Sequence, residues 1–177
     1  HDIDVLVRRR DRISAASLLT KIGYEALPER RSIGRELVLR RNDITIDLHW
    51  ALLRSGRLRH EFVDDILAAR RHIGDIWVPC AEDTFFLLLV HPAFAKHLAG
   101  WGMGLHRVVD VAGWLTAQDT DWGSVADRLA RTGVRTAAWA TLRWTQLLIS
   151  AGDASHLSDM LEALEPGPVR RAWLDAW

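Results

Sequence analysis

The chain of 177 residues contains one cysteine, Cys80, and therefore cannot form an internal disulfide. A lone thiol fits a reducing cytoplasm better than an oxidising compartment. Long hydrophobic runs are also lacking, since the longest extends only from Phe85 to Val90. A membrane-spanning helix needs about 18 or more apolar residues, and no secretory signal pattern is present. We therefore expect a cytoplasmic protein with no membrane partner.

An excess of charge of one sign is the next feature that the sequence lacks. Lysine and arginine together number 23, as do aspartate and glutamate, so the formal net charge at pH 7 is zero. This balance argues against a general polyanion-binding surface, and no general nucleic-acid binding is expected. A local basic patch remains compatible with it, because arginines gather early in the chain, at Arg8, Arg9, Arg10, Arg12, Arg30, Arg31 and Arg35.

The first half of the chain has the pattern of a mixed α/β portion. Apolar residues make up 49% of the sequence, which is enough for a packed core. Apolar residues recur every second residue in some segments, as in strands, and at helical spacing in others. Asn42-Asp43 is a typical turn sequence between two of the strands. The pattern predicts a strand, a helix, two strands, a second helix and a short extended segment, at residues 2–7, 13–22, 35–41, 43–52, 60–71 and 76–79.

After Cys80 only helical periodicity remains. Residues 82–90 form a strongly apolar helix, which Pro92 should kink or follow with a new helix at His91. Glu82 and Asp83 should favour the start of this helix. Four further helices are predicted at residues 104–118, 121–132, 134–150 and 155–165, and a last piece covers residues 168–177. We therefore predict an α+β chain, with an α/β core over residues 1–80 and an all-helical domain over residues 81–177.

Three aspartates are the candidate catalytic and metal-binding residues. Asp2 and Asp4 are two residues apart on one predicted strand and share a face, and Asp47 interrupts a second, apolar strand. If these strands are neighbours, the carboxylates converge, and their mutual repulsion favours a divalent cation with oxygen ligands, such as Mg²⁺. The alternative is a solvated Asp-x-Asp at a strand end. Asp47 argues against it, because aspartate is disfavoured inside strands.

Several other polar residues, most of them histidines, each allow a functional and a structural interpretation. His49 shares a face with Asp47 and either contacts the substrate or acts as a base, or is a structural histidine hydrogen-bonded beside Trp50. Asp110 is expected to pair with a cation such as Arg107. Three further residues are assigned to the binding of substrate phosphate, namely His91, Lys96 and His97. The alternative is that they are solvated or cap a helix. A zinc site and a Walker-type loop are excluded by the absence of their motifs.

The motifs Asp-Ile-Asp-Val-Leu-Val (2–7), Ile-Asp-Leu-His-Trp (46–50) and Val-Pro-Cys-Ala-Glu-Asp (78–83) occur in a recognisable order. In these residues the chain resembles the uncharacterised bacterial nucleotidyltransferase family of the DNA polymerase β-like superfamily. The resemblance implies a mixed β-sheet with flanking helices, followed by a helical domain. It also implies Mg²⁺ or Mn²⁺ as cofactor and a nucleoside triphosphate as co-substrate.

The resemblance further implies a reaction and residue roles. A nucleoside monophosphate would pass to a hydroxyl of a small molecule, peptide or protein, with release of pyrophosphate. Asp2 and Asp4 match the family's metal-binding pair. Asp47 matches the third carboxylate, which also binds metal and helps to activate the acceptor hydroxyl.

One departure from the superfamily pattern concerns phosphate binding. The superfamily has a Gly-Ser or Gly-Gly turn upstream of the acidic pair, whereas this sequence begins at His1 with a strand. We therefore expect an N-terminal piece to precede it. An alternative function is a non-catalytic, antitoxin-like module that binds a protein partner or forms a homodimer, and another is a phosphohydrolase that uses the same carboxylates. Nine tryptophans fit an interface, although core packing is expected for Trp139 and Trp144.

Overall fold

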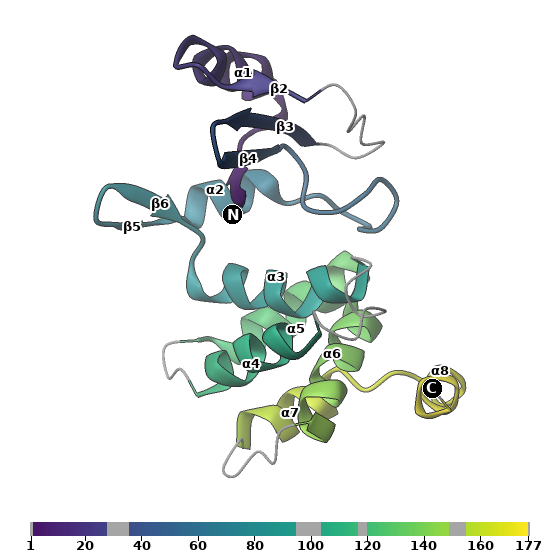
Figure 1. Cartoon of the computed structure of the whole chain (residues 1–177). Helices are drawn as coiled ribbons and strands as arrows, with labels where there is room; N and C mark the ends of the chain where they lie inside the picture. Colours follow the sequence, from purple (N-terminus) through teal and green to yellow (C-terminus); the bar gives the residue numbers. More distant parts are fainter. Residues whose placement is uncertain (1, 28–35, 95–103, 117–119, 149–154, 177) are drawn as a thin grey trace. The chain divides into compact units, whose positions relative to one another are not determined.

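The computed structural model describes residues 2–27, 36–94, 104–116, 120–148 and 155–176 (Figure 1). They belong to two compact units, residues 1–72 and residues 73–177. The division thus lies between His72 and Ile73, whereas the hydropathy pattern suggested a boundary after residue 80. Among the described residues, no helix is both long enough and apolar enough to cross a bilayer.

The first unit contains a four-stranded mixed sheet in the spatial order β1-β4-β3-β2. β1 pairs with β4 in parallel, and the other two neighbouring pairs are antiparallel. The mixed sheet expected from the sequence is therefore confirmed. Its strands are β1 (Asp2–Leu6), β2 (Glu25–Ala26), β3 (Glu36–Arg41) and β4 (Ile44–His49).

A tight hairpin fixes the register of β3 and β4. Arg41 pairs with Ile44, so Asn42 and Asp43 form a two-residue loop, as their sequence suggested. Asn42 has φ 54°, a left-handed conformation that asparagine tolerates and that such hairpin turns require. The hairpin register places Val38 opposite Asp47 and Glu36 opposite His49.

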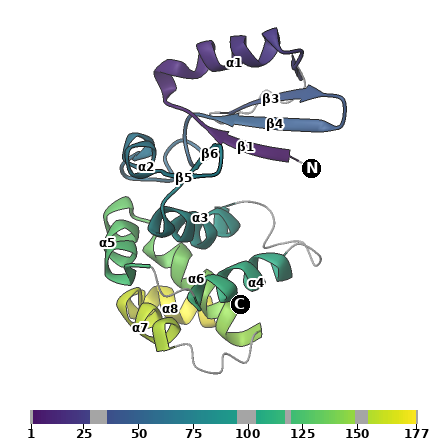
Figure 2. The ribbon, with the colours of Figure 1, turned by 90° about the vertical axis from the view of Figure 1, so that its left-hand side faces the viewer.

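Helix α1 (Arg12–Lys21) covers one face of the sheet, and α2 (Val63–Ala69) lies on the other side (Figure 2). The core beneath α1 is built around the buried side chains of Tyr24, Leu39, Ile46 and Leu48. Because successive strand side chains alternate between faces, the residues between these core positions on β4 point to the opposite face. Asp47 and His49 are therefore directed away from α1, toward the side of α2.

Two short strands were not foreseen. β2 has only two residues, too few for an alternating pattern, and is held by pairing of Glu25 with Arg40 and Ala26 with Leu39. The predicted helix over 60–71 was wrong at its end, because α2 stops at Ala69. β5 (Arg71–Ile73) follows and pairs with β6 (Ile76–Val78).

Beyond β6 the described elements of the second unit are all helices. α3 continues past Pro92 to Phe94 as one helix, so a new helix does not begin at His91. Phe85, Phe86 and Leu89 on α3 are fully buried. The helices are α3 (Ala81–Phe94), α4 (Gly104–Leu115), α5 (Trp122–Thr132), α6 (Arg135–Leu148), α7 (Ser155–Ala163) and α8 (Pro168–Asp175).

Two sequence expectations about this unit have opposite outcomes. Trp139 is buried, as expected, but Trp144 is 47% exposed. Five residues advance a helix by about 140° beyond a full turn, so Trp139 and Trp144 cannot both face the core. The expected contact between Arg107 and Asp110 is present at 3.9 Å between Nη1 and Oδ2.

Asp83, in the first turn of α3, also connects this helix to α5. Its side chain is completely buried, forms an ion pair with Arg128 of α5, and accepts a hydrogen bond from Cys80 Sγ at 3.2 Å. A second link between these helices is made by Glu82, whose Oε1 accepts a hydrogen bond from the Asp121 backbone N–H at 3.1 Å. The acidic start of α3 therefore ties it to α5.

We predict that Asp83→Ala destabilises the protein by about 3–5 kcal/mol, because it leaves the Arg128 charge without its buried partner. Urea-induced unfolding measures the loss. The control is Asp110→Ala, which breaks a half-exposed pair and should cost about 0–1 kcal/mol. Equal losses in the two variants would contradict the structural role of Asp83.

Candidate metal centre

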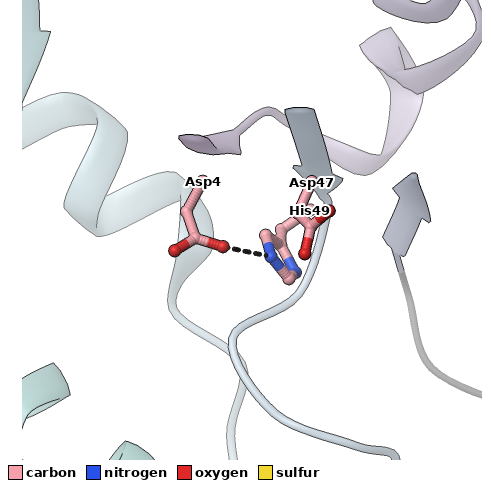
Figure 3. A group of neighbouring side chains, drawn as sticks. All are labelled: Asp4, Asp47 and His49. Carbon is pink, nitrogen blue, oxygen red and sulfur yellow. Dashed lines mark hydrogen bonds and ion pairs between the residues drawn. The ribbon is translucent and has the colours of Figure 1, made fainter. Parts of the chain in front are cut away.

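Asp4 and Asp47 lie side by side on neighbouring parallel strands (Figure 3). β1 and β4 pair in a register that makes these two residues direct partners. Partners in adjacent strands project to the same face of a sheet, so the two carboxylates converge. The condition for convergence, that the strands of Asp4 and Asp47 are neighbours, is thus met, even though α1, β2 and β3 separate them in the chain.

His49 belongs to the same group. Its Nε2 lies 2.9 Å from Asp4 Oδ1, and its Nδ1 lies 3.4 Å from Glu36 Oε2. One ligand atom from each of Asp4, Asp47 and His49 lies within 4.8 Å of the others. Both ring nitrogens face carboxylates, which favours the doubly protonated imidazolium because it can donate to each.

Asp47 is the electrostatically costly member of the group. Burial raises the pKa of its carboxyl, the charge of Asp4 raises it further, and Glu36 and Asp2 add to the effect, whereas His49 opposes it. Asp47 Oδ1 is removed from solvent and has no hydrogen-bond partner among the described residues. A buried acceptor without a partner costs free energy that a bound cation would remove.

His49 responds in the way expected of a counter-charge. Burial alone would lower its pKa, but the hydrogen bond to Asp4 and the charges of Asp4, Glu36 and Asp47 outweigh burial and raise the pKa. His49 is therefore protonated more readily in the folded chain than a free histidine is, and a protonated imidazole offsets part of the charge of the carboxylates. A protonated imidazole cannot ligate a metal.

The donor set of this group fits a hard divalent cation. Asp4 and Asp47 supply carboxylate oxygens, the ligands preferred by Mg²⁺ and Mn²⁺. The Asp47 side chain projects to the face on which Asp4 also lies, and its Oδ1 has no hydrogen-bond partner among the described residues. His49 suits such a cation less well as a ligand, and its contact with Asp4 makes it a residue that orients the carboxylate.

The remaining candidate residues are distributed differently. Asp2 is exposed, and its backbone pairs with Thr45. Its charge raises the pKa of Asp47, but it is not among the three residues whose ligand atoms lie close together. His91 is exposed on α3 in the second unit. Lys96 and His97 lie outside the described residues.

Glu36 is the member of the site that the sequence did not reveal. It is the first residue of β3, and only the hairpin register places it opposite His49. A strand pattern that starts with a charged residue gives no signal of its own. Counting back from the Asn42-Asp43 turn would have identified the pairing.

Comparison with known proteins gives the class. Residues 1–150 match the family described as uncharacterised nucleotidyltransferase. The chain therefore belongs to this nucleotidyltransferase family, which supports nucleotidyl transfer as its general role. The match covers the first unit and extends through the second as far as the end of α6. No curated protein and no solved structure matches the chain.

We predict that Asp47→Asn stabilises the metal-free chain at neutral pH. Its raised pKa means that the ionised form is less favourable in the folded chain than in the unfolded chain. This cost is complete above the raised pKa and disappears as the pH falls below the ordinary value of 3.8. Thermal unfolding in EDTA should show a higher Tm for the variant at pH 7 and a smaller difference in acid.

The matched control is Asp65→Asn, which removes an exposed carboxylate from the first turn of α2 in the same unit. That carboxylate interacts favourably with the helix dipole, so Tm should stay level or fall slightly. Adding Mg²⁺ should raise the Tm of the wild type and of this control but not of Asp47→Asn. A lower Tm for Asp47→Asn in EDTA would show that the carboxylate is a stabilising structural group.

Proposed function

We propose that the protein transfers a nucleoside monophosphate from a nucleoside triphosphate to a hydroxyl acceptor and releases pyrophosphate, in a reaction that requires Mg²⁺ or Mn²⁺. The observation that carries this proposal is the pairing of Asp4 with Asp47, in which one buried carboxylate oxygen lacks a partner. Family membership supplies the reaction class. The carboxylates supply the chemistry on which that class depends.

Asp4 and Asp47 would hold the cation, with Asp2 beside them. When bound, the cation would neutralise phosphate charge and make the acceptor hydroxyl more acidic. Asp2 is exposed at the start of β1, where its charge already acts on Asp47. It would therefore attract the cation electrostatically and stand within reach of its outer ligands.

Asp47 would also take part in proton transfer. The acceptor oxygen attacks the α-phosphorus, a new P–O bond forms, and the bond to the bridging oxygen breaks as pyrophosphate leaves. Asp47 accepts the hydroxyl proton as a general base. His49 keeps Asp4 in position through the 2.9 Å contact and places a positive charge beside the reacting phosphate.

We predict that Asp47→Asn lowers the rate of pyrophosphate release at least about 100-fold. Loss of metal-assisted charge stabilisation costs several kcal/mol, and each 1.4 kcal/mol is about tenfold in rate. The assay mixes full-length protein, nucleoside triphosphate, Mg²⁺ and a panel of hydroxyl acceptors. Asp65→Asn should retain the wild-type rate. Full activity of Asp47→Asn, or activity in excess EDTA, would refute the proposed role.

Product analysis separates transfer from hydrolysis. A transferase yields a nucleotidylated acceptor together with pyrophosphate, whereas a phosphohydrolase yields a free mononucleotide or phosphate without any acceptor dependence. The two outcomes use the same carboxylates, so variants at Asp4 or Asp47 do not distinguish them.

A second candidate is a non-catalytic module that binds a protein partner or a second copy of the chain. Trp144, Leu147 and Leu148 are 47%, 66% and 53% exposed and lie on one face of α6, which favours an interface. Leu147→Glu should abolish any self-association seen by light scattering at increasing protein concentration. A wild-type protein that stays monomeric and releases pyrophosphate would contradict this candidate.

A further inference from the structure

A basic pocket lies immediately after β1. It has a volume of about 400 Å³ and is lined by Arg8, Arg9, Arg10, Arg12 and Asp64. Volumes of this order suit small ligands. Every side chain that lines it is charged, and four of the five are cationic. The arginines are part of the basic cluster noted in the sequence, and the metal-centre chemistry does not use them.

The arginines of this pocket are only partly neutralised. Arg8 Nε donates to Asp64 Oδ1 at 3.0 Å, and Arg10 Nε lies 3.9 Å from Asp11 Oδ1. Two carboxylates against four guanidinium groups leave two positive charges without an acidic partner among the described residues. Clustered like charges repel, so a bound anion would stabilise this region.

Arg12 is held in place without a carboxylate. Its Nη1 donates to the Arg9 carbonyl at 2.8 Å, and its guanidinium carbon lies 5.8 Å from the centre of the Trp50 ring. A guanidinium fixed by a backbone oxygen and an aromatic ring keeps donors available for another acceptor. The pocket therefore contains at least one pre-oriented side chain that can donate hydrogen bonds to an anion.

The pocket is close to the metal centre along the same strand. The Val7 backbone N–H donates to the His49 carbonyl at 2.9 Å, so the pairing of β1 with β4 continues to that point, and Arg8 is extended. Asp4, Leu6 and Arg8 consequently share a face. At a rise of about 3.3 Å per residue, the Cα atoms of Asp4 and Arg8 are about 13 Å apart.

Two further features favour an anion at this place. β1 and β4 are parallel and both end here, and ligands of open sheets bind beyond the carboxyl ends of parallel strands. The ten-residue helix α1 also begins here, and its N-cap residue, Asp11, makes no side-chain capping hydrogen bond. The positive end of the α1 helix dipole therefore lies at this end of the strands.

We propose that Arg8, Arg9, Arg10 and Arg12 form a phosphate-binding subsite that serves the proposed nucleotidyl transfer. The phosphate belongs either to the triphosphate of the nucleotide or to a phosphorylated acceptor. Both sources present the same chemistry, a multiply charged oxyanion that guanidinium groups bind through paired hydrogen bonds. The subsite rests on the proposed function for its biological role but not for its existence, because it can be tested without turnover.

The test is calorimetric titration of the full-length protein with inorganic triphosphate in EDTA at low ionic strength. We expect Arg9→Gln combined with Arg10→Gln to weaken binding at least about tenfold, because the double variant removes two cationic groups that donate charge-assisted hydrogen bonds to the anion. The control is Arg41→Gln, an exposed arginine at the opposite end of the sheet, which should bind as the wild type does. Equal weakening in the control, or none in the double variant, would overturn the proposal.

Asp64→Asn provides a second variant with an effect of opposite sign. Removing the 80% exposed carboxylate releases Arg8 from its ion pair, so triphosphate binding should tighten severalfold. Misfolding cannot produce tighter binding. Unchanged or weaker binding in this variant would count against the subsite.

The source of the phosphate follows from titrations with ATP in EDTA. If the pocket holds the nucleotide's triphosphate, the double variant weakens ATP binding, and saturating ATP blocks inorganic phosphate. If it holds the acceptor's phosphate, ATP binding is unchanged, and inorganic phosphate still binds the ATP-saturated protein. Either result supports the subsite. Phosphate binding by a protein that releases no pyrophosphate would refute the proposed function alone.

Discussion

The backbone pairing of β1 with β4 determines where every charged group of the candidate site lies. Its register makes Asp4 and Asp47 partners, and the hairpin register of β3 then adds Glu36 opposite His49. A slip of one residue would exchange the two faces of β1 and direct Asp4 into the core beneath α1. Val5 opposes that slip, because it packs against the core that contains Ile46 and Leu48 and a slip of one residue would turn it to the other face.

Two clusters of like-charged side chains lie along β1, one of carboxylates and one of arginines. At its start, Asp2 and Asp4 join Asp47 to form a carboxylate group, and just after its end four arginines line a pocket. Each cluster opposes folding by itself, and each is only partly relieved, by His49 in one case and by Asp11 and Asp64 in the other. A ligand that brings a cation and several phosphates together would relieve both. This complementarity connects the metal centre to the pocket more directly than proximity alone.

Much of this arrangement could be predicted from local pattern. Alternation placed Asp4 and Asp47 on polar strand faces, and the Asn42-Asp43 turn identified the hairpin. The parallel pairing of strands separated by a helix and a hairpin leaves no local trace, so the convergence remained conditional until the register was known. The role of Glu36 was missed because it depends on a partner in another strand, and β2 and β5 were missed because two and three residues are too few to show an alternating pattern.

The second unit shows a related limit. The helices were predictable from their apolar stripes, but the role of Asp83 was not, since an acidic residue in a first helical turn usually needs no partner beyond the helix dipole. Its burial against Arg128 arises from the packing of α3 on α5. Trp144 was misplaced for a similar reason, because composition favours burial of any tryptophan while the helical phase exposes this one.

The distance along the chain between the site residues has a consequence for how the protein folds. Asp4 and His49 are 45 residues apart in sequence, and the β3–β4 hairpin can form without β1. β1 joins only when that long loop closes, which costs conformational entropy that local contacts do not offset. The ligand atoms therefore come together only once β1 has paired with β4. Cation binding then requires the complete sheet. Detachment of β1 would abolish binding even in chains that retain their helices and the β3–β4 hairpin.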